Sequence, residues 1–171
     1  MRPGLFLLGA AVVAGCQPNT TRPGFVALPE AAGIEVRLAP RDATRHLADA
    51  LKANAIPIRK VMLRDAYLES GWFSARTGRP TSRRPIGTDI VRVRAWADPA
   101  RVGSSELSVE TVYRLLADPS LPERELDRQV PPGHPTALKV TEVLKQLVER
   151  YGGAPAAAAE TPAPAPESDQ P

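Results

Sequence analysis

Arginine is the residue type whose spacing in this chain most suggests chemistry. Four arginines fall within the nine residues from position 76 to 84, and no acidic residue occurs between Glu69 and Asp89. A guanidinium group presents a planar fork of donors that suits phosphate and carboxylate groups. The cluster is therefore a candidate contact to an anionic surface, such as lipid phosphates, lipopolysaccharide or an acidic partner. Its members are Arg76, Arg79, Arg83 and Arg84.

The same cluster also has a purely structural interpretation. Gly78, Pro80 and Pro85 interrupt the stretch, so no regular element is expected to hold the guanidinium groups in place. On that interpretation the segment is a mobile hairpin loop that its charges keep soluble. Both interpretations stay open at the level of sequence.

A second candidate contact, to a partner protein, surrounds one of the two tryptophans. Residues 89–97 alternate between apolar and polar positions, so Trp96 shares a strand face with Arg92 and Arg94. Tryptophan and arginine are frequent anchors of protein interfaces, and a half-exposed Trp96 would suit that role. The alternative is that Trp96 packs under a loop as part of the fold.

Residues for catalysis or metal binding do not form a recognisable set. His46 and His134 are the only histidines, and no zinc-ligand spacing relates them. Asp65 and Glu69 could be drawn as a carboxylate pair, but on one strand both are expected to face solvent. The chain also lacks a nucleophile elbow, a P-loop and a dinucleotide-binding fingerprint. We therefore expect a protein that is not an enzyme and that needs no metal or other cofactor.

The amino-terminal segment carries one further reactive residue. A positive charge at Arg2 precedes an apolar run of residues 5–13, which leads through Ala14 and Gly15 to Cys16. A short apolar run followed by small residues is typical of a secretory signal peptide. A bilayer-spanning helix needs about 20 apolar residues, so this run is too short for a permanent span. We expect residues 1–15 to be removed.

The position of Cys16 resembles the lipobox of bacterial prolipoproteins. That resemblance implies that Cys16 becomes the first residue of the mature chain, with a diacylglyceryl group on its sulfur and a second acylation at the new amino terminus. More than one acyl chain anchors a protein stably to a membrane. Because Gln17 rather than Asp follows the cysteine, resemblance to Gram-negative lipoproteins implies the outer membrane, facing the periplasm. The alternative is a plain secretory signal in which Cys16 is incidental.

Composition limits the remaining functions. The chain has a formal net charge of +3, a sequence pI near 9.3 and a single cysteine. An anchored envelope protein does not normally meet nucleic acid, so we expect no nucleic-acid partner and at most weak attraction to anionic head groups or glycans. If Cys16 carries lipid, no thiol remains for a disulfide bond, and the fold depends on its apolar core.

Composition also divides the chain into four parts. Residues 1–15 form the signal segment, and residues 16–24 are a polar, proline-containing tether beside the membrane. Residues 25–152 are long enough for a single domain with one core. Residues 153–171 are almost all alanine and proline with a few acids, a composition that predicts a disordered tail.

Within the domain, hydrophobic periodicity predicts two amphipathic helices and four strands. Apolar residues recur at helical spacing over residues 41–54 and again over residues 135–151. Residues 117–134, rich in proline and charge, are predicted to be a long loop or a short helical turn flanked by loops. The predicted strands cover residues 33–38, 58–73 with a bend near position 64, 89–97 and 105–115.

The last two strands are predicted to form a hairpin with one side in water. Each has one apolar and one polar face, as antiparallel strands with a single wet face do. In the simplest register Arg92 lies opposite Glu110, a favourable cross-strand pair.

The order β-α-β-β-β-α predicts an α+β fold. Its simplest form is a two-layer sandwich in which an antiparallel sheet of about four strands packs against two helices. In element order, over residues 34–151, and in its lipoprotein context the domain resembles the helix-grip-like domains of the outer-membrane assembly lipoprotein BamC.

Two classes of function remain. One is a structural or assembly lipoprotein that acts through contacts with an envelope protein. The other is a binding module that grips a lipid, glycan or peptide between sheet and helices. A filled core with an exposed apolar patch would favour the first class, whereas an empty apolar pocket would favour the second.

Overall fold

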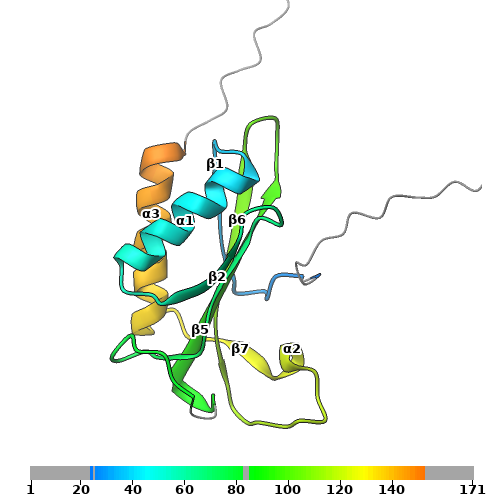
Figure 1. The fold of residues 1–171 in the computed structure, drawn as a ribbon, viewed down its shortest axis with the longest axis vertical. Helices are drawn as coiled ribbons and strands as arrows, with labels where there is room; N and C mark the ends of the chain where they lie inside the picture. The colour runs from blue at the N-terminus through cyan, green and yellow to red at the C-terminus, as the bar shows by residue number, and fades with distance from the viewer. Residues whose placement is uncertain (1–23, 25, 83–84, 153–171) are drawn as a thin grey trace, which may run out of the picture.

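The computed structural model describes residue 24, residues 26–82 and residues 85–152. Within these ranges the chain forms seven strands and three helices, which confirms the predicted α+β class (Figure 1). In chain order they are β1 (Ala32–Val36), α1 (Pro40–Ala53), β2 (Ile58–Met62), β3 (Tyr67–Ser70), β4 (Phe73–Ser74), β5 (Gly87–Pro99), β6 (Ser105–Arg114), α2 (Glu123–Leu126), β7 (Asp127–Gln129) and α3 (Pro135–Tyr151).

All seven strands belong to one antiparallel sheet, so the prediction of about four strands is wrong. The hydrogen-bonded path runs β1-β6-β5-β3-β2. Because β5 occupies one edge of β6, β1 and β7 share its other edge, each along one half. In the same way β3 and β4 both pair with the other edge of β5, one after the other along its length.

Breaks in one predicted strand and a new strand in a predicted loop account for the extra strands. The stretch 58–73 is a hairpin rather than one bent strand, because residues 63–66 form a turn in which Ala66 has a positive φ of 47°. Gly71 and Trp72 then separate β3 from β4. The short β7 lies within the predicted loop region and consists of three polar residues, which give no apolar alternation.

The two long helices cover one face of the sheet, as predicted (Figure 1). Proline occupies the first turn of each, where its missing N–H costs nothing, and the ring of His134 accepts a hydrogen bond from the Thr136 amide to cap α3. Their apolar stripes meet the apolar face of the sheet. The buried core there includes Leu47, Leu51, Leu68, Val91, Val93, Leu107, Val109, Val140, Val143, Leu144 and Leu147.

The opposite face of β5 and β6 is also covered, which corrects the predicted wet face. Arg94, Trp96, Glu110 and Val112 point to that side and are all buried. The cover includes α2, which lies across the sheet from α1 and α3 in Figure 1, and the chain segment 26–28.

The hairpin of β5 and β6 forms as predicted, but its register differs by two residues. Arg94 lies opposite Glu110, and Arg92 lies opposite Val112. The shift arises because β5 continues to Pro99, which shortens the connecting loop to residues 100–104. Gly103 provides the positive φ of 77° that this tighter loop requires.

Candidate functional site

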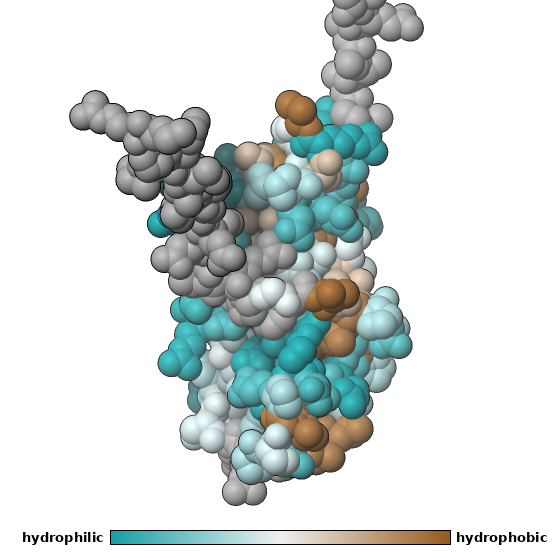
Figure 2. Space-filling model, turned by 90° about the vertical axis from the view of Figure 1, so that its right-hand side faces the viewer, coloured by the Kyte–Doolittle hydropathy of each residue, from teal (hydrophilic) through white to brown (hydrophobic). Residues whose placement is uncertain are grey.

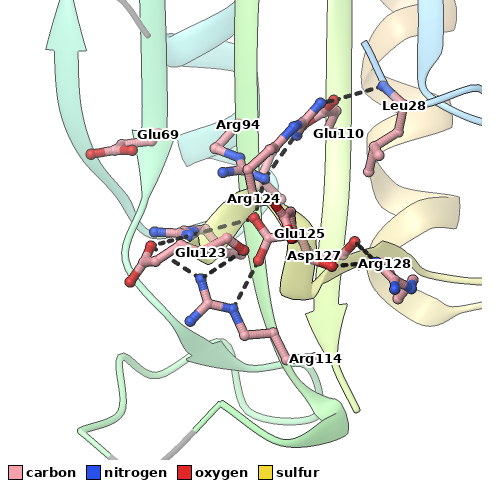
Figure 3. A network of polar contacts seen from close by, with 12 residues as sticks. Leu28, Glu69, Arg94, Glu110, Arg114, Glu123, Arg124, Glu125, Asp127 and Arg128 are labelled. Carbon is pink, nitrogen blue, oxygen red and sulfur yellow. Dashed lines mark hydrogen bonds and ion pairs between the residues drawn. The ribbon is translucent and has the colours of Figure 1, made fainter. Parts of the chain in front are cut away.

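A buried ionic network occupies the covered face of the sheet (Figure 3). Asp127, the first residue of β7, accepts hydrogen bonds from Arg94 Nη2 at 2.5 Å and from Arg114 Nε at 2.8 Å. Arg94 Nη2 also lies 3.5 Å from a carboxylate oxygen of Glu110. Both carboxylates are completely buried, so the two strands and β7 are joined through charged groups removed from water.

The short helix α2 supplies the other half of the network. Arg124 donates to the two carboxylate oxygens of Glu110 at 2.5 and 2.6 Å, a bidentate pair. Glu123 lies 3.1 Å from Arg92 Nη2 and 3.0 Å from Arg114 Nη2. One turn of helix therefore forms ion pairs with both central strands.

The electrostatics of the network favour the ionised forms of Arg114, Glu123 and Arg124. Burial lowers the pKa of Arg114, but hydrogen bonds to Asp127 and Glu123 outweigh burial and raise the pKa above its ordinary value. Burial likewise raises the pKa of Glu123, but hydrogen bonds from Arg114 and Arg92 outweigh it and leave the pKa below its ordinary value. Hydrogen bonds to Glu110 raise the pKa of Arg124. Groups held in this way are suited to fixing structure rather than to exchanging protons.

The network also holds the segment that follows the expected tether. The backbone N–H of Leu28 donates to Glu110 Oε1 at 2.9 Å, and Arg124 Nη2 donates to the carbonyl oxygen of Val26 at 2.6 Å. These bonds join residues that are 82 and 98 positions apart in the sequence. The amino-terminal segment is thus attached to the same face as α2.

The predicted partner contact lies within this covered face. Trp96, Arg92 and Arg94 do share one side of β5, as alternation predicts. However, Trp96 is only 2% exposed, so the expectation of a half-exposed anchor is wrong. Arg94 is buried between Glu110 and Asp127. Of the three, Arg92 comes nearest to the surface, with 14% of its side chain exposed.

The predicted anionic-surface contact is only partly described. Arg76 and Arg79 are exposed and line a hollow of about 420 Å³ together with Asp89, whereas Arg83 and Arg84 lie outside the described residues. The turn that carries the first two is held by backbone bonds: the Gly78 amide donates to Ser74, and the Ser74 amide donates to Arg79. An added Cβ at Gly78, where φ is +70°, would lie 3.1 Å from the Ala55 carbonyl oxygen. This part of the loop is therefore a packed turn.

The lipidation prediction falls on residues that the structure does not describe. Cys16 and the whole signal segment lie outside its ranges, as do residues 153–171. Within the ranges it does describe, no helix has the length and apolar character that a membrane span needs.

An exposed apolar loop is the feature that sequence reasoning missed. Residues 115–122, called the leucine loop below, connect β6 to α2. Its Leu115, Leu116 and Leu121 are 64%, 51% and 43% exposed. Gly87 pairs with Arg114, so the exposed Ile86 lies beside Leu115 just beyond the last paired residues of the sheet.

Figure 2 shows apolar side chains gathered at the lower end of the molecule, the end at which the leucine loop runs in Figure 1. The sequence contained a signal for this surface, because the two adjacent leucines follow the last residue of a strand. Periodicity assigned Leu115 to the strand and hid that signal.

The two histidines, and Asp65 and Glu69, lie where they serve the fold. His46 Nδ1 lies 3.3 Å from the Tyr151 hydroxyl, and His134 caps α3. Glu69 accepts a hydrogen bond from the Tyr67 hydroxyl at 2.7 Å, while Asp65 lies in the turn between β2 and β3. Among the described residues, no group of three or more His, Cys, Asp or Glu side chains is placed to hold a metal ion.

Comparison with known proteins finds no matching family model, curated protein or solved structure. Function must therefore be argued from the residues and their arrangement.

Proposed function

We propose that this protein is a lipid-anchored lipoprotein of the outer membrane, facing the periplasm, that acts without catalysis by contacting another envelope protein through the leucine loop. Anchoring and location rest on the lipobox-like sequence at Cys16 and on Gln17. The contact itself rests on one observation, the exposure of three leucines in a single connection of eight residues, 115–122. Apolar side chains grouped at a surface mark interaction sites.

The chemistry of the loop favours a protein partner over lipid. Asp118 lies among the leucines and accepts hydrogen bonds from the Ser120 hydroxyl at 2.6 Å and the Ser120 amide at 2.9 Å, which hold its pKa below the ordinary value. An ionised carboxylate is costly to move into hydrocarbon. A protein groove with an apolar floor and a polar rim accommodates leucines and carboxylate together.

The alternative function, a module that grips a lipid, glycan or peptide between sheet and helices, has less support. Buried apolar side chains of α1, α3 and the sheet pack against one another in that space, and an open apolar groove of about 380 Å³ remains between β1 and α3. A hollow of about 470 Å³ does lie where β6, β7 and α3 meet, but Glu30, Thr111 and Gln129 give its lining a mixed character. A filled core with an exposed apolar loop is the combination expected of an assembly protein.

Site-specific photo-crosslinking in cells tests the contact. A photoreactive residue at Leu116 should give a discrete adduct with an envelope protein, and the adduct should disappear when Leu115 and Leu121 are both changed to Asp. The matched control is the same residue at Val102, which is fully exposed in the β5–β6 loop. An equal adduct from Val102, or none from Leu116, would overturn the proposal.

Anchoring is tested separately by the substitution Cys16→Ser. The variant should leave the membrane fraction or remain unprocessed, because it has no sulfur to which a diacylglyceryl group can be joined. A variant that is processed normally and still sediments with membranes would contradict lipidation. Density-gradient fractionation of the unaltered protein then distinguishes the outer from the inner membrane.

A further inference from the structure

A basic hollow beside β2 and β3 forms a second surface, lined by none of the residues of the leucine loop. Its volume is about 370 Å³, and its charged lining consists of Arg59, Lys60, Arg92 and Glu69. Arg92 is paired with Glu123, so two further cations, Arg59 and Lys60, share the hollow with one carboxylate, Glu69. Ser70, Gly71 and Trp72 complete the lining.

A β-bulge brings two adjacent cations to this hollow. In a regular strand Arg59 and Lys60 would point to opposite faces. Here Ile58 lies opposite Ser70 and Lys60 opposite Glu69, which makes Arg59 an extra residue in β2. Bulges re-aim side chains, and both cations line the same hollow. Gly71 adjoins Arg59, since a Cβ there would lie in ordinary van der Waals contact, 3.7 Å, with Arg59 Cδ.

The third cation is held in position by its neighbours. Arg92 Cζ lies 4.6 Å from the centre of the Trp72 ring, and Arg92 Nη2 donates to Glu123 at 3.1 Å. Arg114 lies over the same tryptophan at 4.9 Å. Side chains fixed before binding lose less conformational entropy when a ligand arrives. The Arg92 guanidinium is therefore a preorganised part of the wall.

The other two cations have no counter-ion in the part of the chain that the structure describes, where neither Arg59 nor Lys60 lies within 4.0 Å of a carboxylate oxygen. The one acid in the hollow, Glu69, already accepts a hydrogen bond from the Tyr67 hydroxyl. Burial raises the pKa of Tyr67, so that hydroxyl stays protonated and keeps donating. The hollow therefore presents uncompensated positive charge.

We propose that this hollow binds a phosphate monoester. A phosphate dianion would act as the counter-ion of Arg59 and Lys60, which have none among the described residues. Guanidinium forks and an ammonium group are both established partners of phosphate oxygens. The volume is in the range of pockets that hold small ligands, so it accommodates a phosphate group with a small substituent. The same chemistry is offered by a soluble phosphate ester and by a lipid head group. This site goes beyond the proposed leucine-loop contact and does not depend on it.

Tryptophan fluorescence provides a direct test. In the full chain carrying Trp96→Phe, the remaining tryptophan is Trp72, which lines the hollow. Titration with glycerol 1-phosphate, against sodium chloride at matched ionic strength, should give a saturable change. The double substitution Arg59→Ala/Lys60→Ala should weaken that binding at least tenfold. The matched control is Lys139→Ala/Lys145→Ala, which removes two exposed cations from α3 and should leave binding unchanged.

A second measurement covers the case in which Trp96→Phe disturbs the fold. The amide signals of Gly71 and Trp72 in the ¹⁵N spectrum of the unaltered chain should shift during the same titration. Binding to vesicles that contain phosphatidic acid, lost in the Arg59→Ala/Lys60→Ala variant, would assign the phosphate to a lipid head group. No response to either probe, or an equal loss in the control variant, would overturn the site. The variant Leu115→Asp/Leu121→Asp should bind glycerol 1-phosphate normally. The phosphate site and the leucine-loop contact can therefore be refuted independently of each other.

Discussion

Asp127 is the residue on which the covered face of the sheet depends. It is completely buried and accepts hydrogen bonds from arginines of both central strands. Each buried charge loses its hydration, and only close partners offset that loss. Removing one partner is therefore more damaging than the small net contribution of the intact pair would suggest.

The substitution Asp127→Asn tests this dependence. It keeps the shape of the side chain but removes the closest carboxylate from Arg94 and Arg114, which retain only Glu110 and Glu123 respectively, so the free energy of unfolding should fall by up to about 3 to 5 kcal/mol. Urea denaturation measures the change. The control is Glu149→Gln on the exposed side of α3, which should change stability by less than about 0.5 kcal/mol. Equal effects of the two substitutions would mean that the network does not hold the fold together.

Glu123 should make the stability of the protein depend on pH. Its pKa is lower in the fold than its ordinary value of 4.5. The carboxylate therefore contributes stability above pH 4.5, and that contribution is lost as the pH falls through the folded-state pKa. Because 67% of the side chain is exposed, solvent screening keeps the effect small. Glu123→Gln should flatten the acid limb of the stability curve, and a limb of unchanged slope would contradict the assignment.

At the scale of elements, sequence predicted the features that depend on local periodicity. Both long helices and the hairpin of β5 and β6 follow from apolar spacing within one segment. The register of that hairpin does not, because it depends on where β5 ends, and Pro99 still pairs with Ser105. β7 also has no local signal, because its three polar residues gain their place by pairing with β6 and by the contacts of Asp127.

In the candidate sites, too, local pattern was predictable from the sequence and long-range pairing was not. Trp96 was assigned to the correct face of β5, but its burial depends on a cover that no property of residues 89–97 reveals. Glu110 and Asp127 are 17 positions apart (127 − 110) and become neighbours only in the folded sheet. The bulge at Arg59 is likewise a property of strand pairing.

The packing of α3 on the sheet gives a prediction for that element. Leu144 is buried in the core, so Leu144→Ala should cost about 2 to 5 kcal/mol of stability through lost apolar burial and the cavity left behind. Leu138→Ala on the exposed side of the same helix is the matched control and should cost far less. Chemical denaturation measures both. A loss near zero for Leu144→Ala would show that α3 does not pack as described.

At the scale of the whole molecule, α2 connects the segment that follows the expected tether with the leucine loop. Arg124 of α2 holds Val26, and the leucine loop leads directly into the same helix. If Cys16 carries lipid, the nine residues 17–25 reach at most about 30 Å when extended. The leucine loop would then work close to the membrane, on the side of the domain from which the tether leaves.

The attachment of residues 26–28 predicts where the folded domain begins. A chain that starts at Pro29 lacks the Leu28 amide that donates to buried Glu110 and the Val26 carbonyl that accepts from Arg124. Loss of partners from buried polar groups costs about 1 to 3 kcal/mol, so this chain should be less stable by that amount than one starting at Gly24.

A double-mutant cycle shows whether that loss passes through the network or through general fraying. Arg124→Met removes the side chain that links residue 26 to Glu110. If the two changes act on one network, their combined cost should be smaller than the sum of the separate costs, because the bond from Arg124 to Val26 can be lost only once. Thermal unfolding of the four chains measures the coupling. Strictly additive costs would mean that residues 26–28 stabilise the domain independently of Arg124, and a truncation without any cost would mean that the domain begins nearer to β1.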